Sequence, residues 1–109
     1  MRHPLGEEFP REGFVQRAIE AHFAGWERDE TTTADLVCLD VDRGVTWVIE
    51  AKGETAAVGL DFRTGLGQLL AGMTRGRKAN YVLAMPDTPA FEGQRAAVSD
   101  WVRRALNLW

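Results

Sequence analysis

An acid and a lysine interrupt the most apolar stretch of the chain, residues 45–54. Glu50 and Lys52 follow a run of strand-forming residues there and precede a glycine. Because side chains alternate in direction along an extended strand, Glu50 and Lys52 share one face, whereas Ile49 and Ala51 share the other. Such a charge pair is either a solvated gatekeeper of an edge strand or a pair directed at a ligand.

A second predicted strand, residues 34–41, bears on that choice. A turn joins it to the apolar strand, so that the two form a hairpin. A two-residue loop pairs Asp35 opposite Lys52, and a four-residue loop pairs Asp35 opposite Glu50. Directly opposed residues share a face, so both registers bring the three side chains to one side of the sheet. A three-residue loop without a bulge would separate them.

An amphipathic helix predicted over residues 11–24 adds a third acid. Projection at about 100° per residue puts Glu12 on the inward side of the helix and Glu20 at its margin. Glu12 therefore either joins the other two acids or complements the helix dipole in water. His22 lies within the apolar stripe, which predicts a packed core histidine. The stripe is formed by Val15, Ile19 and Phe23.

The remaining elements complete an α/β pattern. Residues 26–30 form a possible first strand. A second helix is predicted over residues 61–75, and a strand over residues 80–85 follows it. Because a helix intervenes, this strand joins the sheet parallel to the apolar strand. A last helix is predicted over residues 94–106, and the apolar ending after it is either a short strand or a surface for a second subunit.

The second helix has two unlike sides. Its predicted core stripe is Phe62, Leu66, Leu69, Leu70 and Met73. On the other side Gln68 aligns with Thr64, beside a groove at Gly65 and Gly72. Glycine in a helix interior costs up to about 1 kcal/mol relative to alanine. The groove therefore predicts a close approach, by a nucleic acid or by a partner helix.

Composition indicates one folded domain, residues 11–109, after a loose tail, residues 1–10. Of the 109 residues 45% are apolar, no stretch is long enough to span a membrane, and no secretory signal begins the chain. The single cysteine, Cys38, fits a reducing cytoplasm.

The charge is unevenly distributed along the chain. The net charge is −3, but residues 1–61 carry thirteen acids and six bases, whereas residues 62–109 carry three acids and seven bases. The basic part is either a solvated face or a surface for a phosphate backbone. The residues expected to contact DNA in that case are Arg63, Thr64, Arg75, Arg77 and Lys78.

Two converging carboxylates without a histidine or cysteine cluster favour a hard divalent cation, magnesium or manganese, over zinc. A lysine beside them suits orientation or deprotonation of a water and stabilisation of charge on a phosphate. That chemistry is phosphodiester hydrolysis. A serine or cysteine triad is disfavoured because Ser99 is the only serine and Cys38 lies in an apolar strand. The chain also has no phosphate-loop motif.

The order of these elements and motifs resembles the PD-(D/E)XK nuclease superfamily, and most of all its small branch of Holliday-junction resolvase-like and Mrr-like restriction nucleases. The resemblance covers residues 11–86 and is carried by Glu12, Ala34-Asp35, Glu50-Ala51-Lys52 and Gly65-Leu66-Gly67-Gln68. It departs from the motif at Ala34, which replaces the proline. It implies a restriction-endonuclease-like αβββαβ core, a mixed central sheet flanked by helices.

The resemblance also implies roles. Asp35 and Glu50 become the metal ligands, with the Ala51 carbonyl as a possible further ligand, and Lys52 becomes the water-activating or charge-stabilising group. An acid on the first helix, Glu12 or Glu20, and Gln68 on the second complete the catalytic set. The implied reaction is attack of water on a DNA phosphodiester, in which the 3′ oxygen leaves and the 5′ phosphate is retained.

Two other functions stay open. One is a non-catalytic DNA-binding or assembly module that keeps the nuclease fold, favoured by the acidity and the small size. The other is an unrelated α/β interaction domain, which requires a register that separates Asp35 from Glu50. Cutting two strands with one small site suggests a homodimer, with Trp101 and Trp109 as candidates for its interface.

Overall fold

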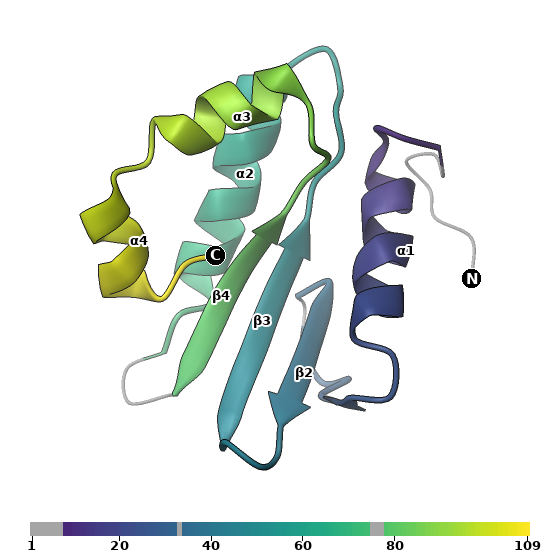
Figure 1. The fold of residues 1–109 in the computed structure, drawn as a ribbon, viewed down its shortest axis with the longest axis vertical. Coiled ribbons are helices and arrows are strands. Elements are labelled where there is room, and N and C mark those ends of the chain that lie inside the picture. Colours follow the sequence, from purple (N-terminus) through teal and green to yellow (C-terminus); the bar gives the residue numbers. More distant parts are fainter. Residues whose placement is uncertain (1–7, 33, 75–77) are drawn as a thin grey trace.

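The computed structural model describes residues 8–32, 34–74 and 78–109. Within these residues the chain has an α/β fold with a four-stranded mixed sheet and four helices (Figure 1). The elements in chain order are α1 (Glu12–His22), β1 (Glu27–Arg28), β2 (Leu36–Asp40), β3 (Val45–Ala51), α2 (Val58–Ala71), β4 (Ala79–Ala84), α3 (Pro89–Ala96) and α4 (Asp100–Leu106).

The sheet has the order β1-β2-β3-β4, in which β1, β2 and β3 are antiparallel neighbours and β4 is parallel to β3. The parallel pairing of the last strand, predicted from the intervening helix, is confirmed. The fold therefore agrees with the α/β class and, from α1 to β4, with the predicted order of elements.

The β2–β3 hairpin has the four-residue loop. Leu36 pairs with Ile49 and Asp40 pairs with Val45, so residues 41–44 form the connection. Gly44 has φ +65°, a conformation that glycine adopts without strain. Continued by one residue, this register puts Asp35 opposite Glu50, which is the alternative that places both acids on one face.

Helices cover the two faces of the sheet. On one face α1 packs its apolar stripe against Leu36, Cys38, Ile49 and Ala51. On the other face α2 packs Phe62 and Leu69 against Val37, Val48, Tyr81 and Leu83. In Figure 1 α1 and α2 lie to either side of β3. The alternation of β3 explains this layering, because odd-numbered residues face α1 and even-numbered residues face α2.

Three predictions within the helices were wrong. Helix α2 begins at Val58 and ends at Ala71, with Gly72 at its C-cap, and does not span the predicted residues 61–75. Leu70 is 47% exposed and is not part of the core. His22 is exposed at the last turn of α1 and is not a core histidine. Its ring contacts Phe23 edge to face, which a surface position allows.

The predicted last helix is two helices. Thr88 accepts a hydrogen bond from the Phe91 backbone N–H and Pro89 occupies the first turn, so α3 starts earlier than expected. A second start at Ser99 then begins α4. The break turns the predicted core residue Trp101 to solvent, where it is 70% exposed.

The apolar ending of the chain extends the sheet. Trp109 donates its backbone N–H to the Tyr81 carbonyl at 2.7 Å, and its carbonyl accepts from the Leu83 N–H at 3.0 Å. Leu108 forms a parallel bridge with Tyr81 and is buried. The pairing favours the short-strand alternative for residues 107–109.

None of the helices within the described residues is long and apolar enough to cross a membrane.

Candidate functional site

Asp35 and Glu50 meet at the start of β2 and the end of β3. The Asp35 Oδ2 atom accepts a hydrogen bond from the Ala51 backbone N–H at 2.7 Å. Glu50 is 7% exposed, and the Asp35 carboxyl group lies close enough to raise the Glu50 pKa by hydrogen bonding and by its charge. The two carboxyl groups predicted to share a face are therefore in contact.

Burial and the neighbouring acid change the protonation of Glu50. Desolvation, then the hydrogen bond and the negative charge of Asp35, raise its pKa from 4.5 to about 8, against a smaller opposing effect of Lys52. At neutral pH Glu50 therefore keeps its proton. A cation between them would neutralise the same repulsion, so the pair suits a positively charged ligand.

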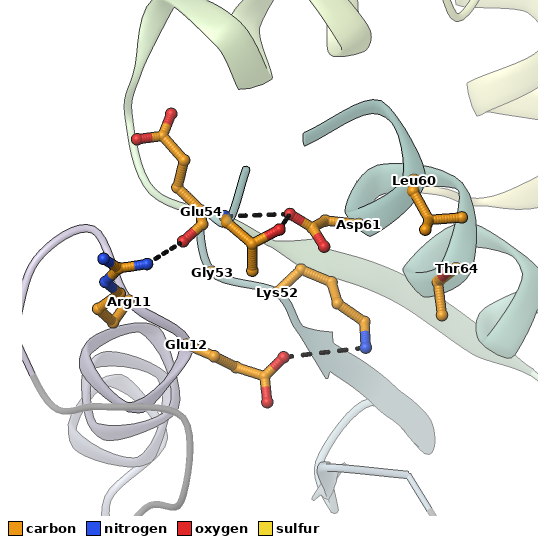
Figure 2. Close-up of a pocket in the computed structure, with 9 residues that line it drawn as sticks. Arg11, Glu12, Lys52, Gly53, Glu54, Leu60, Asp61 and Thr64 are labelled. Atoms are coloured by element: carbon orange, nitrogen blue, oxygen red, sulfur yellow. Dashed lines mark hydrogen bonds and ion pairs between the residues drawn. The ribbon is translucent and has the colours of Figure 1, made fainter. Parts of the chain in front are cut away.

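Lys52 continues from this pair towards α1. Its Nζ atom lies 3.8 Å from the Glu12 Oε1 atom (Figure 2). Burial raises the pKa of Glu12, and the positive charge of Lys52 opposes that effect. Of the two helix acids considered, Glu12 is the one that reaches Lys52, because Glu20 lies about two turns further along α1.

Two glycines bring these segments into contact. A Cβ atom on Gly53 would lie 1.9 Å from the Glu12 backbone nitrogen, so the end of β3 touches the start of α1 directly. A Cβ atom on Gly65 would lie 2.8 Å from the Lys52 Cγ and 2.6 Å from the Leu83 Cδ1. The absence of a side chain at both positions lets Lys52 extend between the two helices.

The contact at Gly65 corrects a prediction. The groove at Gly65 and Gly72 was expected to admit a nucleic acid or a partner helix. Gly65 is instead buried against Lys52 and Leu83 of the same chain, and Gly72 is the C-cap of α2. The close approach was predicted correctly, but its partner is the candidate catalytic lysine.

A pocket of about 310 Å³ opens beside Lys52 (Figure 2). It lies between the start of α1, the first turns of α2 and the residues that follow β3. Its lining residues are Arg11, Glu12, Lys52, Gly53, Glu54, Thr55, Leu60, Asp61 and Thr64. Asp35 and Glu50 do not line it, so the pocket adjoins the acid pair through Lys52.

Most of the other predicted site residues within the described ranges lie outside the pocket. Thr64 lines the pocket, whereas Gln68 is exposed one turn further along α2 and lies outside it. Arg63 is exposed on α2. Lys78 lies at the opposite end of the sheet, because its carbonyl accepts from the Thr46 N–H near the start of β3. The predicted DNA contacts Arg75 and Arg77 lie outside the described residues.

Sequence reasoning missed part of the pocket lining. Asp61 accepts hydrogen bonds from the Thr55 N–H at 3.1 Å and the Thr55 hydroxyl at 2.7 Å. Arg11 donates to the Glu54 carbonyl at 3.1 Å. The one available signal was position, since Asp61 and Thr55 flank the linker between the predicted strand and the second helix.

The donor atoms that could hold a metal are few. No group of three or more histidine, cysteine, aspartate or glutamate side chains within residues 8–32, 34–74 and 78–109 is placed to hold an ion. The Ala51 carbonyl adds a backbone donor. The Lys52 N–H bonds to the Ala84 carbonyl of β4, so the backbone groups of Ala51 point to the β2 side, where Asp35 lies. Two carboxylates and one carbonyl are all oxygen donors, which suits magnesium or manganese.

In comparisons with known proteins, no family model, no curated protein and no solved structure matches the chain.

Proposed function

We propose that the protein is a metal-dependent nuclease that hydrolyses DNA phosphodiester bonds, with a restriction-endonuclease-like core of the PD-(D/E)XK type. The observation that carries this proposal is that Asp35 contacts both Glu50 and the Ala51 N–H. These are the two residues that precede Lys52 in the chain. The register of the hairpin could have separated these groups, and it brings them together instead. Their types and order are those that the family resemblance requires.

Asp35, Glu50 and the Ala51 carbonyl would hold the ion. Their oxygen donors fit magnesium or manganese, and the proton on Glu50 is what such an ion would replace. When bound, the metal supplies Lewis-acid polarisation of the phosphate and lowers the pKa of a nearby water.

Lys52 stabilises the charge that develops on the phosphate and orients the attacking water. Its aliphatic part is held by packing against Gly65, and its ammonium group is held by Glu12 at 3.8 Å. Such pre-organisation matters because a fixed donor stabilises a transition state without reorganising. The water oxygen forms the new bond to phosphorus and releases one proton to solvent, the bond to the 3′ oxygen breaks, and the 3′ oxygen takes up one proton from solvent.

The test is cleavage of a DNA panel by the purified protein and by two variants. We expect nicking or cutting with magnesium or manganese, and loss of cleavage by at least about a hundredfold in Lys52→Ala. Arg43→Ala is the matched control, because Arg43 is an exposed cation in the hairpin loop at the other end of β3. Circular dichroism checks that both variants fold. Equal cleavage by Lys52→Ala and the wild type would refute the assignment.

A non-catalytic DNA-binding or assembly module is the second candidate. The observation in its favour is that, within the described residues, no histidine, cysteine or third acid joins Asp35 and Glu50 in a group placed to hold an ion. Titration calorimetry with manganese separates the two functions, because a site that has lost catalysis is expected to bind no ion. Manganese binding that disappears in Asp35→Asn favours the nuclease.

A further inference from the structure

The pocket beside Lys52 extends beyond Lys52 and Glu12, and its other lining residues have no role in the reaction described above. Its walls come from three segments: Arg11 and Glu12 at the start of α1, residues 52–55 after β3, and Leu60, Asp61 and Thr64 in the first turns of α2. Four consecutive residues, 52–55, form one of these walls. Its volume of about 310 Å³ suits a ligand of the size of one nucleoside.

The charges in the pocket do not favour a phosphate as its occupant. Arg11 and Lys52 carry positive charge, but Glu12 and Asp61 balance them, and the Glu54 side chain points away (Figure 2). Arg11 also already donates a hydrogen bond to the Glu54 carbonyl. A neutral ligand that forms hydrogen bonds does not need an excess of positive charge in the pocket.

The wall formed by α2 matches a neutral ligand with an apolar face. Leu60 is 65% exposed and offers apolar surface at the rim. Thr64 follows one turn later, lines the pocket and is exposed. Asp61 uses its Oδ2 atom for Thr55. A base could pack against Leu60, while its polar edge or the sugar hydroxyls reach Thr64 and Asp61.

We infer that this pocket is a binding site for the sugar and base of one unpaired nucleotide, next to the phosphate that Lys52 contacts. The inference rests on the proposed function for that phosphate and names its substrate class: DNA with unpaired nucleotides, such as a single strand or a flap. A nucleotide in a continuous duplex would have to leave its stack to enter. Extrusion costs a few kcal/mol, and it costs least for a base that is already unpaired.

The experiment compares one labelled strand in three forms: alone, in a continuous duplex, and as a flap on a duplex. With manganese we expect the unpaired nucleotides to be cut at least about tenfold faster than the same sequence in the duplex. Thr64→Trp fills the pocket and should lower single-strand cleavage by about tenfold or more. Leu70→Trp is the matched control, an exposed position on the same helix outside the pocket.

A second variant and a binding measurement keep the inference testable. Leu60→Asp adds a carboxylate at an exposed rim position and should weaken single-strand binding without unfolding the protein. Fluorescence anisotropy with Asp35→Asn, whose altered residue lies outside the pocket, compares the affinities for the single strand and the duplex without cleavage.

The possible outcomes separate the two proposals. Equal cleavage of duplex and single strand, or equal activity of Thr64→Trp and Leu70→Trp, overturns the nucleotide pocket and leaves the nuclease standing. Absence of cleavage together with a single-strand preference that Thr64→Trp and Leu60→Asp remove supports the pocket and overturns the nuclease. Absence of both cleavage and preference overturns both.

Discussion

The Lys52 ammonium lies 3.8 Å from the Glu12 carboxylate, although the rest of α1, strand β1 and the β2–β3 hairpin separate the two residues in the chain. Both groups are partly buried, with 18% and 28% of their side chains exposed. The pair links the first helix to the candidate acid site. It is therefore the contact through which α1 can influence catalysis.

Removal of the Glu12 charge should slow the reaction without abolishing it. In Glu12→Gln the Lys52 ammonium loses its anionic partner and its fixed position, so we expect DNA cleavage to fall by about tenfold, or about 1.4 kcal/mol of transition-state stabilisation. The control is Glu27→Gln on the exposed edge strand β1. Kinetics with saturating manganese measure the effect, and equal rates for the two variants would contradict the role of Glu12.

A methyl group at Gly65 should displace Lys52. The added Cβ atom would come within 2.8 Å of Lys52 and 2.6 Å of Leu83. Gly65→Ala should therefore destabilise the protein by about 1–3 kcal/mol in urea unfolding, and it should also reduce DNA cleavage because Lys52 is displaced. Gly67→Ala is the matched control. It lies in the same helix with nothing within 4 Å, and there alanine should stabilise by up to about 1 kcal/mol. Equal stability of the two variants would disprove the close packing at Gly65.

The raised pKa of Glu50 predicts how the free energy of unfolding depends on pH. The folded protein holds this proton up to about pH 8, whereas the unfolded chain releases it near pH 4.5. Between these values the folded state binds more protons, so the contribution is complete below pH 4.5 and is lost as the pH rises towards 8.

The Glu50→Gln variant isolates that contribution. It should remove most of the decline in stability between pH 5 and pH 8. At pH 8 it should also be more stable than the wild type, because each unit by which the folded pKa of Glu50 exceeds its unfolded pKa is worth about 1.4 kcal/mol. Urea unfolding across this range, in metal-free buffer, measures it. A wild-type stability that rises steadily over the same interval would contradict a protonated Glu50.

The C-terminal strand should contribute to stability through one side chain. Leu108 is buried in the cluster on the α2 face, whereas Trp109 is 66% exposed. Truncation of a buried leucine to alanine typically costs about 2–5 kcal/mol, so Leu108→Ala should lower the free energy of unfolding by about 2 kcal/mol or more. Trp109→Ala should cost less. The reverse order would show that residues 107–109 do not pack as a strand.

Local patterns predicted the elements that carry the candidate site. Alternation in residues 45–52 predicts which face of β3 is apolar. Of the three loop lengths considered for the hairpin, two bring Asp35 to the face of Glu50, and the structure has the four-residue loop. The end of the chain was harder. Thr88, Pro89 and Ser99 give start signals for two helices, but the apolar spacing of Val98, Trp101 and Val102 imitates one continuous helix.

Contacts between distant segments could not be read from the sequence. The spacing of Gly65 and Gly72 indicates that something approaches α2 closely, yet identifying Lys52 as that neighbour requires the packing of α2 on β3. Likewise Asp61 and Thr55 have ordinary types for a helix start and a linker. Only the fold turns them into walls of a pocket.

Gly53 makes the join between the first helix and the third strand a matter of main chain alone. No substituent of any size fits there, since the first atom of a side chain would overlap the Glu12 backbone. A saturation library at this codon should thus retain a single amino acid. The backbone contact would then fix the position of Glu12 relative to Lys52, whatever side chains occupy the surrounding surface.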